Sequence, residues 1–257
     1  MNLRFPAAKQ QAFTLMEMLV VVAILLVLAA IAFPVYFAVK SRGDQATALT
    51  NMRNLGGALA TYVGQNDGTF PAEDSKGIDS WASAAKPENR GVWYNALPKI
   101  LGYKAVGDYG NNAREFYTKR NILFLPGATY PEADTKLTAP LFAIAINTKL
   151  ERKDPSTKEK LPIKLSAVTS PTKTVAFLEQ GLPKEKKAMA QQPKYDGSCK
   201  GSAKSFVARY GGKGVLTFVD GHADTFEGKD ILTETGGFPF PQINVVWTKT
   251  PEEDPNK

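Results

Sequence analysis

The sequence predicts an α+β fold in which a long N-terminal helix carries a small antiparallel β-sheet head. Two observations predict the helix: residues 18–39 are uncharged and almost wholly apolar, and an apolar stripe with helical spacing follows over residues 44–64. A third observation predicts the head. From residue 66 onward, short apolar runs alternate with Gly, Pro and Asp-Gly turn signals.

The first element is a transmembrane helix over about residues 16–39. Residues 18–39 suffice to span a bilayer as a helix, and cations bracket them: Arg4, Lys9, Lys40 and Arg42. The alternative is a cleaved secretory signal peptide, with Ala29-Ala30-Ile31-Ala32 as the cleavage pattern. The run exceeds the usual signal-peptide core and continues into a helical pattern, which favours an uncleaved anchor.

Glu17 and Pro34 are the unusual residues of this helix. A carboxylate inside hydrocarbon costs at least a few kcal/mol, so an intramembrane acid indicates a function and needs a partner. The alternative is that Glu17 lies at the membrane interface and extends toward water. Pro34 removes one helical hydrogen bond and bends the axis, and the sequence leaves open whether the bend has a further role.

An amphipathic second half continues this helix over residues 44–64. Its apolar stripe predicts packing against a soluble domain and consists of Ala48, Met52, Leu55, Leu59 and Tyr62. Asn66-Asp67-Gly68 is a strong stop signal, so the helix is expected to cover residues 13–65 and the globular head residues 66–247. Residues 248–257, rich in Pro and acids, are expected to form a disordered tail.

Composition restricts the function classes. The chain of 257 residues has a formal charge of +7, and six of its lysines lie in residues 182–204, which we interpret as a solvated loop. Tyr195 is the only aromatic residue there, so nucleic-acid binding is not favoured. Cys199 is the only cysteine and excludes an intrachain disulfide. His222 is the only histidine, so a histidine-based zinc site or catalytic triad depends on that residue, and an enzyme is not favoured.

The head is predicted to contain a short helical segment at residues 93–101 and buried strands at residues 141–146 and 174–178. Its clearest element is a hairpin of residues 214–219 and 222–226 around Asp220-Gly221, a pair typical of a two-residue type I′ turn. Such a turn places Val219 opposite His222, Thr217 opposite Asp224 and Val215 opposite Phe226. Leu216 and Phe218 are then expected on the opposite face, in the core.

Residues 9–24, with Lys9-Gln10-Gln11-Ala12 before Phe13-Thr14-Leu15-Met16-Glu17, closely resemble the processing site of type IV prepilins and type II secretion pseudopilins. The resemblance implies a pilin-like fold and a cytoplasmic leader of residues 1–12. It also implies cleavage by a prepilin peptidase between Ala12 and Phe13, with methylation of the new Phe13 amine. The family usually has Gly before the cut, where this chain has the small residue Ala12.

The same resemblance implies roles and partners. Glu17 would pair with the Phe13 amine of a neighbouring subunit, and Pro34 would lie where local helix melting accompanies filament packing. The implied partners are other pilin subunits, the prepilin peptidase, and an assembly ATPase acting through a membrane platform. The implied location is the inner membrane, crossed once, with the head in the periplasm until the subunit enters a filament.

A second stretch resembles pilin-like proteins that carry an Arg-His pair followed nine residues later by Asp-Gly-His. Here Arg209-Tyr210 precedes Asp220-Gly221-His222, so Tyr210 replaces the histidine of the pair. Because major pseudopilins have a calcium-stabilised loop, Asp220 and Asp224 are candidate oxygen ligands for calcium. Their spacing does not match an EF-hand and the turn already explains Asp220, so the sequence predicts no metal ligand set and no cofactor.

The expected function is a structural subunit of a type II secretion pseudopilus or a type IV pilus-like filament. The absence of paired cysteines near the C-terminus slightly disfavours the disulfide-looped type IV pilins. One alternative is a minor or tip pilin, or another membrane-anchored binding module, that uses the basic loop and exposed aromatic residues. The other is an envelope enzyme built on the only compact polar cluster, Asp220, His222 and Asp224.

Overall fold

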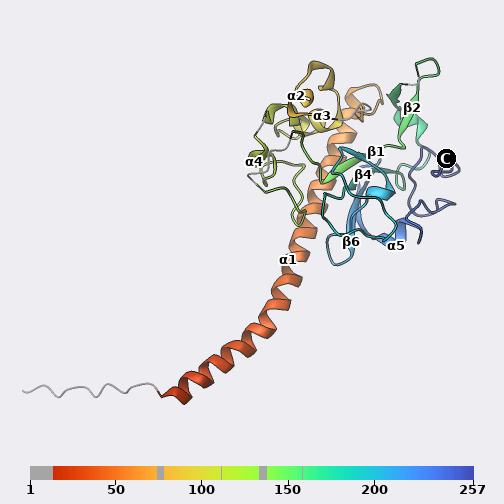
Figure 1. The fold of residues 1–257 in the computed structure, drawn as a ribbon. Coiled ribbons are helices and arrows are strands. Elements are labelled where there is room, and N and C mark those ends of the chain that lie inside the picture. The colour runs from red at the N-terminus through yellow and green to blue at the C-terminus, as the bar shows by residue number, and fades with distance from the viewer. Residues whose placement is uncertain (1–13, 74–77, 111, 133–137, 158) are drawn as a thin grey trace, which may run out of the picture. The chain divides into compact units, whose positions relative to one another are not determined.

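A computed structural model describes residues 14–73, 78–110, 112–132, 138–157 and 159–257 (Figure 1). The chain divides into two units, Met1–Lys40 and Ser41–Lys257. The helix α1 (Leu15–Gln65) begins in the first unit and ends in the second. The other helical elements are short: α2 (Trp81–Ala84), η1 (Pro87–Asn89), α3 (Trp93–Ile100), η2 (Val106–Tyr109), α4 (Ala113–Phe116), η3 (Leu165–Ala167), η4 (Ala203–Ser205) and α5 (Gly228–Ile231).

In the first unit, α1 exposes almost every apolar side chain. Its most apolar window has a mean hydropathy of 3.1 and none of it is buried. By length and composition, α1 is the one helix among the described residues that could cross a membrane. The helix continues through Pro34.

In the second unit, a mixed sheet forms the centre, with strand order β5-β1-β4-β6-β7. The strands are β1 (Ile144–Asn147), β4 (Val175–Glu179), β5 (Lys200–Gly201), β6 (Lys213–Phe218) and β7 (Ala223–Glu227). All neighbours pair antiparallel except β5, which runs parallel to β1. A separate hairpin joins β2 (Glu151–Lys153) to β3 (Lys160–Pro162). The predicted α+β architecture with a small, mainly antiparallel sheet is confirmed.

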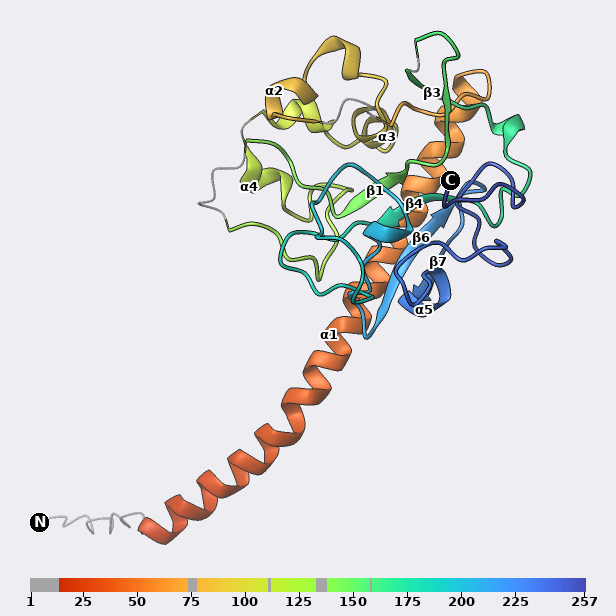
Figure 2. The ribbon, with the colours of Figure 1, turned by 45° about the vertical axis from the view of Figure 1, so that its right-hand side comes forward.

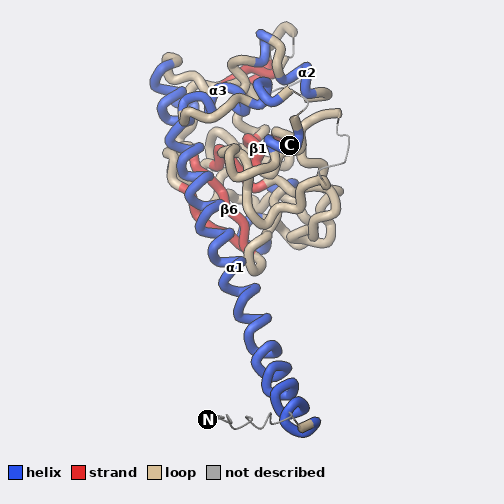
Figure 3. Tube along the Cα trace, turned by 90° about the vertical axis from the view of Figure 1, so that its left-hand side faces the viewer, coloured by secondary structure: helices blue, strands red, loops and turns tan. Residues whose placement is uncertain are grey.

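The two faces of the sheet bury different partners. One face packs against the C-terminal half of α1, where Ala48, Met52, Leu55 and Leu59 of the predicted stripe are all buried. Thr217 Oγ1 of β6 donates to the Met52 carbonyl across 3.1 Å, and Figures 2 and 3 both show β6 beside α1. The other face packs against C-terminal residues, with Phe238 and Trp247 over Leu216 and Phe218. Both faces of β6 are therefore covered.

The β6–β7 hairpin differs from its predicted register by one residue. Leu216 pairs with Asp224 and Thr217 with Ala223, so Val219, Asp220 and Gly221 form a three-residue loop. Gly221 N donates to the Phe218 carbonyl, and only Gly221 in the loop has positive φ, at 92°. The predicted two-residue type I′ turn is therefore wrong, because Asp220 does not take the positive φ that such a turn requires.

This loop packs directly on α1. A Cβ atom added at Gly56 would lie 2.5 Å from the Gly221 carbonyl oxygen and 2.8 Å from Thr217 Cγ2. A neighbouring position on the helix is open, because a Cβ atom at Gly57 would meet nothing within 4 Å. The close approach of helix and hairpin thus depends on the missing side chain of Gly56.

Two segments are more ordered than the sequence suggests. The lysine-rich stretch has Lys184, Lys186, Lys194 and Lys204 at the surface, but Tyr195 is buried and its hydroxyl donates to the Phe206 carbonyl across 2.6 Å. The stretch is therefore a tethered loop with exposed lysines. The expected disordered tail forms turns instead, where Thr248 is buried and Asn256 exchanges hydrogen bonds with the Phe238 backbone.

Cys199 lies in the core beside β5, with 1% of its surface exposed. Its carbonyl accepts a hydrogen bond from Trp93 Nε1 at 3.0 Å, which ties α3 to the edge of the sheet. Trp93 and Tyr94, the aromatic residues of the predicted helical segment, are both fully buried. Packing rather than a disulfide therefore holds this part of the head together, since the chain has one cysteine.

Candidate functional site

The N-terminal site begins at the first turn of α1, where Thr14 and Glu17 form a capping box. Thr14 N and Thr14 Oγ1 each lie 2.8 Å from Glu17 Oε2, and Glu17 N donates to Thr14 Oγ1 at 3.2 Å. Such a box satisfies backbone groups that the start of a helix leaves unpaired. The predicted cleavage residues Ala12 and Phe13 lie outside the described residues.

Glu17 and Pro34 lie in the same unit but are not brought together. They are 17 residues apart on one helix, or about 26 Å at the rise of an α-helix. Within one subunit, the Glu17 and Pro34 side chains are therefore too far apart to contact each other. The sequence contains the Thr-x-x-Glu signature of a capping box, but the roles predicted for Glu17 were pairing between subunits and an interfacial position, not a helix cap.

Asp220 and His222 lie together at the tip of the hairpin. Asp220 Oδ1 is 2.6 Å from His222 Nδ1 and accepts from His222 N, while the imidazole stacks on Phe218 at 4.4 Å between ring centroids. The Asp224 carboxylate accepts from Thr225 N. The arrangement closes the loop over Phe218. No group of three or more His, Cys, Asp or Glu side chains among the described residues is placed to hold a metal ion.

Arg209, from the other predicted motif, is the centre of a buried ionic cluster. Its side chain is only 3% exposed, and its Nη1 lies 2.9 Å from Glu179 Oε2. Its Nε and Nη2 bind both carboxylate oxygens of Glu185, at 2.9 and 2.7 Å, and Nη2 also donates to the Gln180 carbonyl. The neighbouring Tyr210 hydroxyl donates to the Pro126 carbonyl at 2.7 Å. The pair therefore joins its own segment to residues 179–185 and to Pro126.

The ionisation of this cluster is shifted by burial. Burial raises the pKa of Glu179 to about 7, although the nearby Arg209 guanidinium lowers it. Two carboxyl groups face one guanidinium, so a proton on Glu179 leaves the cluster electrically balanced. The Arg209 cluster is thus a structural element. No local motif indicated its carboxylate partners, because they lie 24 and 30 residues away in the chain.

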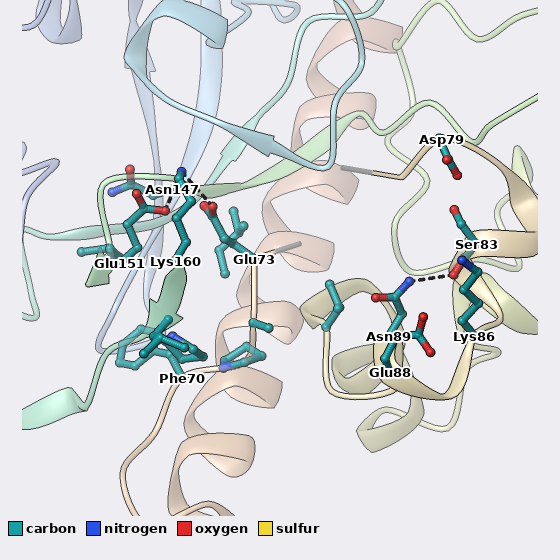
Figure 4. A pocket seen from close by; sticks show the side chains of 17 residues that line it. Phe70, Glu73, Asp79, Ser83, Lys86, Glu88, Asn89, Asn147, Glu151 and Lys160 are labelled. Atoms are coloured by element: carbon teal, nitrogen blue, oxygen red, sulfur yellow. Dashed lines mark hydrogen bonds and ion pairs between the residues drawn. The ribbon is translucent and has the colours of Figure 1, made fainter. Parts of the chain in front are cut away.

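The head also contains a cavity of about 370 Å³, which the sequence did not reveal (Figure 4). Four stretches line it: residues 70–73 after α1, the α2–η1 region, the link from β1 to β2, and β3. Its walls are apolar at Phe70, Val92 and Leu150. Its polar rim holds two groups of side chains, and Figure 4 shows Glu73, Glu151 and Lys160 in one and Asp79, Lys86 and Glu88 in the other.

The Glu73 group is a compact ion network. Lys160 Nζ lies 3.1 Å from Glu73 Oε1 and 2.7 Å from Glu151 Oε2. Burial, followed by the neighbouring Glu151, raises the pKa of Glu73 to about 7. Burial opposes the charge of Lys160, but its hydrogen bonds to Glu151 and Glu73 outweigh burial and raise its pKa. The network holds the β2–β3 hairpin against the segment that follows α1.

Comparisons with known proteins bear on the N-terminal site alone. No curated protein and no solved structure matches the chain. Residues 7–33 match the prokaryotic N-terminal methylation motif. This match covers the predicted processing site, the Thr14–Glu17 capping box and most of the exposed apolar helix. The chain therefore carries the signal of type IV prepilins and pseudopilins at the start of a pilin-like fold.

Proposed function

We propose that this chain is a structural subunit of a type II secretion pseudopilus or a type IV pilus-like filament. The observation that carries the proposal is the N-terminal methylation motif over residues 7–33, placed on an apolar helix that a head follows. A prepilin peptidase cuts between Ala12 and Phe13 and the new amine is methylated. The mature subunit then comprises a helix over residues 13–65 and a head over residues 66–247.

Assembly follows from the chemistry of Glu17. Within the described part of a single subunit, its carboxylate is bonded only to Thr14 of its own first turn, and both residues are exposed. A cationic N-terminal amine on a neighbouring subunit adds a charge-assisted bond in surroundings that screen charges poorly. Because this contact joins the end of one subunit to another subunit, repetition gives an open helical filament.

The location and partners follow from the same route. The apolar helix anchors the subunit in the inner membrane with its head in the periplasm, and an assembly ATPase drives its incorporation through a membrane platform. The structural motif supports a non-enzymatic role. The Asp220–His222 pair closes a hairpin loop, so an enzyme built on these residues has no support from their geometry.

The experiment is N-terminal and intact mass spectrometry of the membrane-extracted protein from cells with and without the peptidase. We expect a mature chain that begins at methylated Phe13 only where the peptidase is present. A chain that begins at Met1 in both strains, or one cut after Ala30 or Ala32, would overturn the proposal.

A second candidate is a minor or tip pilin, or an anchored binding module. The observation that favours it is the cavity in the head, because a subunit that only packs needs no such site. Quantitative mass spectrometry of isolated filaments separates the two: a major subunit dominates the filament, and a minor one is present at a few copies or none.

A further inference from the structure

The cavity beside Glu73 combines two acids that share one lysine, Glu73 and Glu151 with Lys160, with apolar walls. We propose that it binds a small organic cation, in which a primary amine or guanidinium group sits at Glu73 and an apolar chain lies along Phe70 and Leu150. This inference is independent of the filament proposal, since it rests only on the head.

The first argument is charge. Four carboxylates line the cavity, Glu73, Asp79, Glu88 and Glu151, against two ammonium groups, Lys86 and Lys160. The chain as a whole has a formal charge of +7, so the cavity rim is acidic although the protein is basic overall. A cation is therefore attracted to the cavity rather than to the average surface of the head.

The second argument is that one lysine serves two acids. Lys160 donates to Glu73 Oε1 and also pairs with the Glu151 carboxylate. Burial and the neighbouring Glu151 raise the pKa of Glu73 to about 7, so at pH 8 this pair of acids carries more negative charge than Lys160 neutralises. An ammonium or guanidinium donor in the cavity would offset that surplus charge with a charge-assisted bond.

The third argument is shape. A volume of about 370 Å³ lies in the range of small-molecule sites, which are mostly apolar with a few placed polar groups. The walls contributed by Phe70, Val92 and Leu150 suit an alkyl chain. An organic cation with such a chain uses both parts of the cavity, whereas an inorganic ion would use only the rim.

A divalent metal fits less well. Lys160 Nζ already lies between Glu73 and Glu151 and would repel such an ion (Figure 4). No group of three or more metal-ligating side chains of the His, Cys, Asp or Glu type occurs in the described ranges of the chain. A monovalent organic cation adds a single charge at the acidic rim and leaves the Lys160 ion pairs intact.

The test is isothermal titration calorimetry on the full-length chain in non-ionic detergent at pH 8. The probes are n-pentylamine and, as the neutral control of equal length, 1-pentanol. We expect saturable binding of the amine with a Kd of about 1 mM or lower and none of the alcohol. Glu73→Gln should weaken amine binding at least about tenfold, while Glu159→Gln, an exposed acid between β2 and β3, should change it less than about twofold.

The pH dependence gives a second readout. The charged groups around Glu73 are Glu151 and Lys160 of the hairpin and Asp79, Lys86 and Glu88 across the cavity. With a Glu73 pKa of about 7, the ionised fraction rises from about one tenth at pH 6 to about nine tenths at pH 8. Amine affinity should therefore rise about tenfold between these pH values, and Glu73→Gln should remove the rise.

The ammonium group in the cavity can belong to a free amine or to a lysine side chain of another protein. An acetylated peptide with one lysine is therefore titrated in parallel. Binding of n-pentylamine alone supports a free amine, and tighter binding of the peptide supports a protein side chain. If neither probe binds saturably, or if Glu73→Gln binds the amine as tightly as the unaltered chain while both remain folded by circular dichroism, the inference is wrong.

Discussion

At the scale of single residues, the Arg209 side chain binds several buried polar groups at once. It binds Glu179, Glu185 and the Gln180 carbonyl while almost fully buried. A buried ion cluster adds little net stability over apolar residues, because its charges are desolvated. Removing one member of the cluster lowers the stability of the head, because the remaining charged groups stay buried without a partner.

We therefore expect Arg209→Ala to lower the free energy of unfolding by about 3–5 kcal/mol. The measurement is chemical unfolding of the chain in detergent, followed by tryptophan fluorescence. Arg120→Ala is the matched control, because Arg120 is exposed, and it should change the free energy by less than about 0.5 kcal/mol. Equal effects of the two substitutions would contradict the role assigned to the cluster.

A pH effect also belongs to this scale. Burial raises the pKa of Glu179 from 4.5 to about 7 on folding, so the folded head binds this proton more tightly than the unfolded chain does. The stabilisation is fully present below about pH 4.5 and is lost as the pH rises through about 7. We expect the thermal midpoint to fall between pH 5 and pH 8, and Glu179→Gln to flatten that fall. Glu73, shifted in the same direction, accounts for a remaining slope.

At the scale of elements, the contact between α1 and the β6–β7 hairpin leaves no room for a side chain at Gly56. We expect Gly56→Ala to destabilise the head by about 1–3 kcal/mol, because the new Cβ meets backbone at 2.5 Å. Gly57→Ala should instead stabilise it by up to about 1 kcal/mol, since that position is open and Ala favours helix. Thermal melts of both variants check the opposite signs. Destabilisation by both would show that helix context, not hairpin contact, decides the effect.

Elements with one dominant local signal were predictable. The run at residues 18–39 and the stripe ending at Tyr62 predicted a continuous helix, and the structure has one helix, Leu15–Gln65. The predicted strands at residues 141–146 and 174–178 lie within three residues of β1 and β4. Hydrophobic periodicity depends on neighbours in sequence, and these elements are defined by such neighbours.

Features decided by distant residues were not predictable. The hairpin loop has three residues rather than two. The cross-strand partner of every β6 residue is therefore shifted by one position along β7. The cavity brings lining residues from 70–92 beside others from 146–162, more than 50 residues further along the chain, so no local motif marks it. The tethering of the lysine-rich loop likewise depends on a Tyr195 contact with Phe206 that composition does not show.

At the scale of the whole molecule, the two units have different surfaces. The first exposes large apolar side chains such as Leu25 and Leu26, whereas the second buries its apolar residues around one sheet. Neither surface alone makes a filament. The proposed contact between subunits is the pairing of the Glu17 carboxylate with the N-terminal amine of a neighbour. Its role can be separated from processing, because the cut site and the carboxylate are different residues.

We expect Glu17→Gln to be cleaved and methylated as the unaltered chain is, but to lose at least about nine tenths of its filament incorporation. The readouts are N-terminal mass spectrometry and the amount of subunit in sheared filaments. Glu234→Gln removes an exposed charge from the head and should assemble normally. Normal assembly of Glu17→Gln would contradict the proposed charge pairing.

The burial of Cys199 has a practical consequence. A thiol that is 1% exposed can react with a reagent only when the head around β5 opens, and no second cysteine competes for the label. The labelling rate of the unaltered protein therefore reports local opening of the head, measured in the membrane or in a filament. A cysteine introduced at the surface, by contrast, would label at once, so a single chain can carry both a reporter of its folding and a selective point of attachment.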